Sequence, residues 1–214
     1  SCTSLESITI PSSVTTIGNG SFSSCTSLES ITIPSSVTTI GSSSFYNCKS
    51  LESITIPSSV TSIGSGAFKE CENLKSVTIN SQIKSIECET FYNCTSLSQI
   101  SIPDSVENID HFAFFNCHSL KDFVFPKTLK SINLSAFNNS DLNVISIPTN
   151  LNINQSKLRS DQIIIIKFYN PNQPENESYL HPDLQDDQCT FILTRRKMFI
   201  QKLFTCKTCQ LKQG

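Results

Sequence analysis

The feature that most restricts the fold of this chain is a motif that returns every 23 residues. Residues 2–24 and 25–47 differ at only four of 23 positions. A fixed period of this length predicts a solenoid, in which coils of equal length stack and each coil contacts only its neighbours. Three kinds of apolar residue keep the step: Leu5, Leu28, Leu51, Leu74, Leu97 and Leu120; Phe22, Phe45, Phe68, Phe91, Phe114 and Phe137; Cys2, Cys25, Cys48, Cys71, Cys94 and Cys117.

Each unit contains one segment with the pattern of a β-strand. In the first unit, Ile8 and Ile10 lie two residues apart, as a strand with one buried face requires. The Thr and Ile residues around them favour the same structure. Pro11 ends the strand because it cannot donate a hydrogen bond to a continuing ladder. Val14 and Ile17 then supply a second apolar pair on the return side of the coil.

The rest of the unit predicts turns. Glycine follows the return segment at Gly18, Gly41 and Gly64, which suits a turn with positive φ. Glu87 at the equivalent place weakens a strict requirement for that conformation. The three-residue apolar spacing from Phe22 to Cys25 predicts a single helical turn.

Stacking of the units buries side chains that no unit could bury alone. Hydrophobic residues make up only 37% of the chain and Trp is absent, so the core depends on their periodic arrangement. The strands must then form a parallel sheet on one face of the solenoid. Its outward positions, which we expect to contact a ligand, are Glu6, Ser7, Thr9, Glu29, Ser30, Thr32, Glu52, Ser53, Thr55, Lys75, Ser76, Thr78, Ser98, Gln99, Ser101, Lys121 and Asp122.

The unit L-x-x-I-x-I-P-x-x-V-x-x-I-G-x-x-x-F-x-x-C resembles the BspA-like class of leucine-rich repeat, over about residues 1–150. The sequence therefore predicts an α/β solenoid of about seven such 23-residue repeats. A parallel β-sheet would form one face, and short helical turns or 3-10 elements the other. The resemblance implies a curved, concave strand face and a role in adhesion or protein recognition, usually on cell-surface proteins. It implies no catalytic residues.

The repeats degrade toward the C-terminus, where the composition also changes. Residues 151–171 are expected to cap the solenoid, with a last strand at about 163–170. Residues 172–188 carry five acids and no Lys or Arg, which indicates an acidic linker. Residues 189–214 carry six basic residues and no acid, and form a separate Cys-containing segment. The first coil has no cap, which predicts further repeats upstream in the native protein.

The ladder cysteines are expected to be buried free thiols that pack as small hydrophobic side chains. Cys88 is off register, so we expect it near the surface without a special role. Cys117 adjoins His118, but a Cys–His nucleophile requires the two side chains to meet in a cleft, and a ladder cysteine points inward. The sequence thus predicts no enzyme.

Three further cysteines suggest a metal site. Cys206-x-x-Cys209 is a common zinc half-site, and Cys189 could supply a third ligand in a longer chain. His181 could complete the set of four. The segment C-T-F-I-L-T-R-R-K-M-F-I-Q-K-L-F-T-C-K-T-C resembles the start of a UBR-type zinc finger. That resemblance implies recognition of destabilising N-termini of proteins or another role in ubiquitin ligases.

Two functions are therefore open. The first is a non-enzymatic recognition or adhesion module of a larger, cell-surface protein with a protein ligand. The second is a cytoplasmic adaptor of the ubiquitin system, in which the solenoid selects a substrate and the zinc finger binds a partner.

The net charge of −2 gives no reason to expect nucleic acid as a partner, and the longest aliphatic run, residues 163–166, is too short to insert into a membrane. An acidic stripe at Glu6, Glu29 and Glu52 suits a basic partner, although repeat duplication alone would also produce it.

Overall fold

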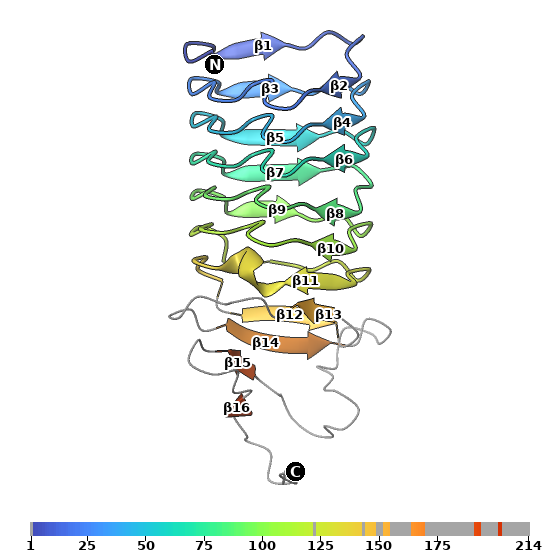
Figure 1. Cartoon of the computed structure of the whole chain (residues 1–214), viewed down its shortest axis with the longest axis vertical. Helices are drawn as coiled ribbons and strands as arrows, with labels where there is room; N and C mark the ends of the chain where they lie inside the picture. The colour runs from blue at the N-terminus through green and yellow to red at the C-terminus, as the bar shows by residue number, and fades with distance from the viewer. Residues whose placement is uncertain are drawn as a thin grey trace.

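The chain forms a stack of coils along one axis (Figure 1). The computed structural model describes residues 2–121 and 123–142, and the backbone of five further segments: 144–148, 152–154, 164–169, 191–193 and 201–202. In its regular structure, parallel strands dominate and neighbouring coils pair in register. The predicted leucine-rich repeat solenoid is confirmed.

One face carries the longer strands. They are β1 (Ser7–Thr9), β3 (Ser30–Thr32), β5 (Ser53–Ile56), β7 (Ser76–Ile79) and β9 (Gln99–Ser101). Strand β1 pairs with β3, and β5, β7 and β9 form a second parallel ladder. We call this surface the strand face. Its strands end just before Pro11, Pro34 and Pro57, as expected from the missing N–H group of proline.

The return side of the coil also forms a ladder, which the sequence pattern had not predicted. Its short strands are β2 (Thr16–Ile17), β4 (Thr39–Ile40) and β6 (Ser62–Ile63) in one sheet, and β8 (Ser85–Ile86), β10 (Asn108–Ile109), β11 (Ser131–Asn133) and β13 (Asn152–Asn154) in another. All of these pairs are parallel. We call this surface the return face.

Helical structure is sparser than expected. Among the described residues, one 3-10 helix, η1 (Leu134–Phe137), is present. In the first coil the segment equivalent to η1, residues 19–22, is a turn. The helical turn predicted from Phe22 to Cys25 is also a turn, closed by the bond from the Cys25 N–H to the Phe22 carbonyl at 3.2 Å. The described part of the chain contains no helix long and apolar enough to span a membrane.

Beyond the regular coils, strand β12 (Val144–Pro148) pairs in parallel with β14 (Ile164–Tyr169). Strand β14 confirms the strand predicted at about 163–170, but two further strands follow it, so it is not the last one. It pairs on its other edge, antiparallel, with β15 (Phe191–Leu193), which pairs with β16 (Gln201–Lys202). Most of residues 151–214 lie outside the described part, so the predicted cap, acidic linker and basic segment stay predictions.

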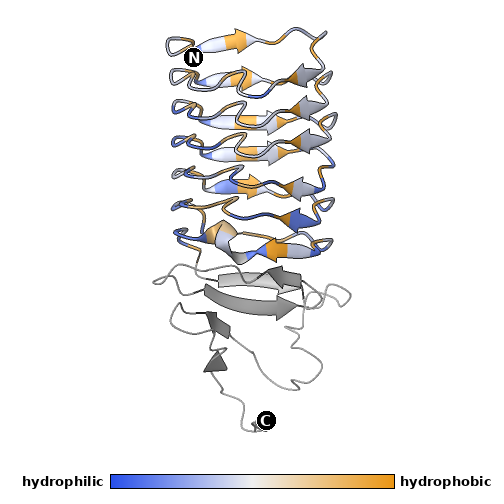
Figure 2. Cartoon of the chain, in the orientation of Figure 1, coloured by the Kyte–Doolittle hydropathy of each residue, from blue (hydrophilic) through white to orange (hydrophobic). Residues whose placement is uncertain are grey.

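The core consists of columns of identical side chains running along the stack. Figure 2 shows the apolar positions recurring at the same place in successive strands. The ring of Phe45 stacks on that of Phe22 at 5.2 Å and on that of Phe68 at 5.3 Å between centroids. The column continues through Phe91, Phe114 and Phe137, and all but Phe22 are fully buried. Each stacked ring thus buries its apolar faces against the rings of the neighbouring coils.

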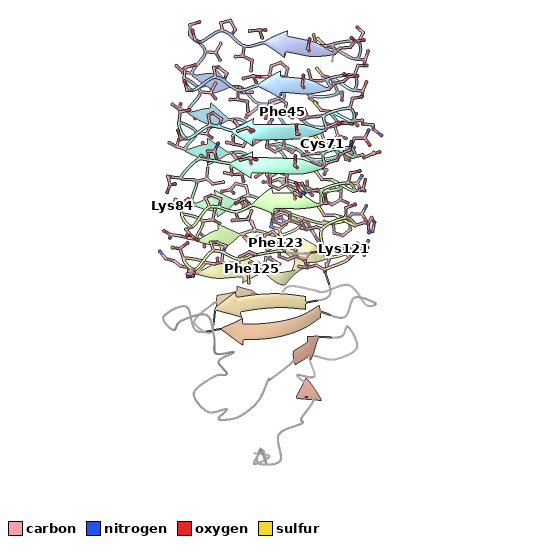
Figure 3. All side chains as sticks on the ribbon, turned by 180° about the vertical axis from the view of Figure 1, so that it is seen from behind. Phe45, Cys71, Lys84, Lys121, Phe123 and Phe125 are labelled. Carbon is pink, nitrogen blue, oxygen red and sulfur yellow. The ribbon has the colours of Figure 1, made fainter. Side chains whose placement is uncertain are left out.

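The cysteine column is a column of free thiols, as predicted. Cys25, Cys48, Cys71, Cys94 and Cys117 are buried, whereas Cys2 is exposed in the first coil. The Cys71 thiol donates to the Phe45 carbonyl of the preceding coil at 3.1 Å (Figure 3). Cys94 and Cys117 make the equivalent bonds to Phe68 and Phe91.

The prediction of positive φ at Gly18, Gly41 and Gly64 is wrong. Positive φ occurs instead at two other positions of the coil. One lies two residues after these positions and comprises Gly20, Ser43, Gly66, Glu89 and Phe112. The other lies four residues further along and comprises Ser24, Asn47, Glu70, Asn93, Asn116 and Asn139. Glycine is needed at 41 and 64 for a different reason. A Cβ atom on Gly64 would lie 2.5 Å from the backbone nitrogen of Ser42, so the side chain is excluded by the neighbouring coil.

Candidate functional site

The outward residues of the strand face are accessible, as their alternation with the buried isoleucines predicts. Of the predicted contact residues, Ser76 is half-buried and Asp122 lies outside the described residues. Pairing in register places equivalent residues beside one another on successive coils, for example Ser7 beside Ser30 and Thr55 beside Thr78. The exposed members are Glu6, Ser7, Thr9, Glu29, Ser30, Thr32, Glu52, Ser53, Thr55, Lys75, Thr78, Ser98, Gln99, Ser101 and Lys121.

Charges on the strand face are partly paired. The Lys75 ammonium lies 2.8 Å from the Glu52 carboxylate, with both side chains more than half exposed. Exposed pairs of this kind add little to stability. Within the described part of the chain, Glu6 and Glu29 form no ion pair. The acidic stripe expected from the sequence is therefore reduced to these two free carboxylates at its N-terminal end.

An open hollow of about 390 Å³ lies over β7 and β9. Val77 and Ile100 contribute to its lining, and the remaining lining residues are polar. These polar residues can donate and accept hydrogen bonds through hydroxyl and amide groups. They are Ser76, Thr78, Ser98, Gln99 and Ser101, all of which the sequence had assigned to the ligand-binding face.

The sequence prediction missed an apolar residue on the same face. Val124 is 84% exposed and continues, one 23-residue step later, the column that Thr78 and Ser101 occupy. Its neighbours Phe123 and Phe125 point inward against the Phe137 ring, with centroids 5.1 and 5.7 Å away (Figure 3). The signal was present in the sequence, because F-V-F replaces I-x-I here and leaves an apolar residue at an outward position.

The return face has its own charged and polar groups. Glu107 forms ion pairs with Lys84, at 3.1 Å, and with Lys130, so that three coils are linked. Hydrogen bonds from Lys130 and then Lys84 lower the pKa of the Glu107 carboxyl. A second hollow, of about 400 Å³, lies over β8, β10 and β11. Its polar lining consists of Ser85, Glu87, Asn108, Asp110, Ser131 and Asn133.

His118 and His111 have different surroundings. Cys117 points inward as predicted, and its thiol donates to the Phe91 carbonyl at 3.2 Å. His118 is about half exposed and lies 3.6 Å from Asp141. His111, by contrast, meets Cys88, with its Nε2 atom 2.9 Å from Sγ. Sequence reasoning overlooked this pair, although a separation of 23 residues places two side chains side by side.

The predicted zinc ligands Cys189, Cys206 and Cys209, and the fourth candidate His181, all lie outside the described residues. Within the described part, no three metal-ligating side chains form a group suited to a metal ion. Zinc binding in the tail stays a prediction, and so does the ubiquitin-system adaptor that depends on it.

Comparison with known proteins agrees with the repeat geometry. The family model of the BspA type leucine rich repeat region matches residues 1–95 and 84–177, in 6 copies. A leucine-rich repeat protein from Bacteroides ovatus is 33% identical, with a TM-score of 0.68, over 71% of this chain and 40% of that chain. A leucine rich cell surface protein from Faecalibacterium prausnitzii is 29% identical, with a TM-score of 0.66, over 81% and 50%.

The chain thus spans half or less of the length of these two solved proteins. The Treponema pallidum leucine rich repeat protein is also similar, at 33% identity and a TM-score of 0.54, over 56% of each chain. None of the curated proteins compared with the chain matches it.

Proposed function

Because the chain belongs to the BspA-type leucine-rich repeat family, we propose that it is a non-enzymatic, protein-binding module of a larger cell-surface protein and that the strand face is its binding surface. Proteins of this architecture bind other proteins, and their folds are typically not enzymatic. The observation that carries the proposal is the exposed, in-register array of hydroxyl, amide and charged side chains on the strand face.

Three properties of this surface suit a protein partner. It is extended and held by paired strands, so that few groups must be ordered on binding. The hollow over β7 and β9 is lined by hydroxyl and amide side chains that can form hydrogen bonds. Val124 provides an apolar contact at one end, and Glu6 and Glu29 provide free carboxylates at the other. Such a mixture of polar and apolar contacts is typical of protein interfaces.

The cell-surface location rests on the similarity to the Faecalibacterium prausnitzii protein, which is described as a leucine rich cell surface protein. A role in adhesion is what the resemblance to BspA-like repeats implies for such a surface protein. Antibody labelling of intact cells, with a cytoplasmic protein as the control for lysis, tests the location. Labelling only after permeabilisation would contradict it and favour an intracellular adaptor.

The binding surface is tested with matched triple variants. Ser7→Arg, Thr32→Arg and Thr55→Arg together place bulky charges on the strand face, where these three side chains are exposed. Thr16→Arg, Thr39→Arg and Ser62→Arg place the same charges on the return face, in β2, β4 and β6. A partner is first selected from an array of purified extracellular proteins, and its Kd is then measured by biolayer interferometry.

We expect the strand-face variant to bind at least about tenfold more weakly, a loss of about 1.4 kcal/mol or more, and the return-face variant to bind as the unchanged protein does. Loss of binding only in the return-face variant would assign the ligand to the other side of the solenoid. Equal affinity of both variants and the unchanged protein would contradict a role for either face at these positions.

A further inference from the structure

One hydrogen-bonded group of side chains has no role in the proposed protein binding. Residues 88 and 111 occupy the same position in consecutive coils, because they are 23 residues apart. Backbone hydrogen bonds join the turns of neighbouring coils at this position. The Gly66 N–H donates to the Cys88 carbonyl at 2.9 Å, and the Glu89 N–H donates to the His111 carbonyl at 3.2 Å. The stacking therefore holds the Cys88 thiol beside the His111 imidazole, with Sγ and Nε2 at 2.9 Å.

Asp110 determines which ring nitrogen of His111 carries the proton, and so which nitrogen can act as a base toward the thiol. Its Oδ1 atom accepts a bond from the His111 backbone N–H at 2.6 Å and lies 2.8 Å from Nδ1 of the same residue. An ionised carboxylate only accepts hydrogen bonds, so Nδ1 of the neutral ring carries the proton. Nε2 is then an acceptor, and the Cys88 S–H group donates to it. A nucleophile, a base and a group that orients the base thus form a continuous chain.

The surroundings of Cys88 distinguish it from the other thiols. Burial, and next the carboxylates of Glu89 and Asp110, raise the pKa of Cys88 to about 11, and Glu87 adds to this effect. Lys69 lowers the pKa, although its ammonium also pairs with Glu89 at 2.7 Å. Little free thiolate would exist at neutral pH without a base. A thiol of high pKa is, however, an intrinsically strong nucleophile once a base removes its proton.

We propose that Cys88 is a site of mixed-disulfide formation, with His111 as the general base and Asp110 as the positioning residue. The ligand class is a disulfide, in a small molecule or an exposed peptide. A disulfide fits because attack on sulfur creates no oxyanion, so an open surface is sufficient. The turn is accessible, since Cys88 is half-buried and the His111 and Asp110 side chains are each 47% exposed.

The step is a thiol–disulfide exchange. The Cys88 proton moves to Nε2 of His111 as Sγ attacks the nearer sulfur of the ligand. A new S–S bond forms between Cys88 and that sulfur, and the S–S bond of the ligand breaks. The departing thiolate takes the proton from the imidazolium and leaves as a thiol. The ligand disulfide is the oxidant, and Cys88 is the group oxidised.

Oxidised glutathione is the probe in the test. The reduced protein is mixed with it, samples are quenched over time, and mass spectrometry of peptides follows each cysteine separately. At pH 7 we expect Cys88 to react at least about tenfold faster than the exposed Cys2, because general-base assistance contributes factors of this size or larger. The inward-pointing thiols of Cys48, Cys71, Cys94 and Cys117 should stay unmodified in the folded protein.

Variants separate base catalysis from simple exposure. His111→Gln should slow Cys88 at least about tenfold without changing Cys2. The Cys88 rate in this variant should rise only as the thiol itself ionises, toward its pKa of about 11, whereas the unchanged protein should already react at neutral pH. The control His118→Gln alters a second histidine beside a carboxylate, Asp141, and should leave the Cys88 rate unchanged. Equal Cys88 rates in His111→Gln and the unchanged protein would overturn the proposal.

Two further variants test geometry and folding. Asp110→Ala should slow Cys88 and shift the His111 ring toward protonation at Nε2, which ¹⁵N chemical shifts report. Ser65→Cys in a Cys88→Ser background places the thiol at the same position of the preceding coil, without a facing histidine. If that thiol reacted as fast as Cys88, accessibility alone would explain the rate and the proposal would be wrong. This comparison holds even if His111→Gln fails to fold.

Discussion

Burial raises the pKa of thiols in the cysteine column, such as those of Cys48, Cys71 and Cys94. The Cys48 thiol lies in the core and donates to the Phe22 carbonyl at 3.1 Å. Burial, and then the neighbouring Cys25, raises the pKa of Cys48 from an ordinary value of 9.0 to about 12. At a pH between 9.0 and about 12, the folded protein therefore keeps a proton on Cys48 that the unfolded chain releases. Residue type alone does not determine this, since Cys2 in the first coil is exposed.

The pH dependence of stability follows from this difference. Between pH 9 and 12 the unfolded state binds fewer protons, so the free energy of unfolding decreases as pH rises. We expect Cys48→Ala to remove this contribution, making the decrease shallower by up to about 1.4 kcal/mol per pH unit. Urea unfolding under reducing conditions at several pH values from 8 to about 10.5, the range in which the thiol difference grows, measures it. Parallel stability curves for the two proteins would contradict the buried, neutral thiol.

At the scale of elements, the coil depends on how closely its turns approach those of the neighbouring coils. Gly41 and Gly64 follow the short return strands β4 and β6, and their α-carbons face the backbone of the preceding turn. The turns that need a left-handed conformation are separate, and residues as different as Gly66, Glu89 and Phe112 adopt it. Hydrogen bonds between neighbouring turns, such as Asn93 N–H to the Phe115 carbonyl at 2.8 Å, offset the cost of that conformation.

A single methyl group should test the close approach. In Gly64→Ala, the new Cβ would lie 2.5 Å from Ser42 N and 2.8 Å from the carbonyl carbon of Gly41, so the two coils must separate. We expect a loss of about 1–3 kcal/mol in the free energy of unfolding, measured in urea. Gly18→Ala is the matched control, because its nearest atom is the Ser21 hydroxyl at 3.3 Å. If both variants lost the same stability, the contact with the neighbouring coil would not be the cause.

At the scale of the whole molecule, each coil is stabilised by the two coils that flank it. The aromatic column shows this most directly, because the Phe68 ring is packed between Phe45 at 5.3 Å and Phe91 at 5.5 Å. Removal of one whole period should therefore join equivalent surfaces, whereas removal of part of a period should misalign every column after it.

Deletion of residues 48–70, one period of 23, should give a shorter solenoid that still unfolds cooperatively. Its denaturant m-value should be smaller, because less surface is exposed on unfolding. Deletion of residues 48–58 is the control, and we expect it to lose the sheet signal in circular dichroism. A folded product from the shorter deletion, or an unfolded one from the full period, would contradict stacking in register.

The sequence was sufficient to predict the coil, its buried columns and the accessible residues of the strand face. These follow from the order of residues within one unit, such as the alternation of buried Ile54 and Ile56 with outward Thr55. The unit is repeated often enough to exclude chance. Local alternation and proline placement act over a few residues, so they can be recognised without knowledge of the fold.

Contacts between coils could be assigned only from the tertiary structure. The two-residue strands of the return face are too short to give a periodic signal, and they exist because the next coil supplies their hydrogen bonds. The same holds for the ion pair of Glu52 with Lys75 and for the contact of Cys88 with His111. Each joins residues 23 apart, and only the register between neighbouring coils decides which side chains meet and which way they point.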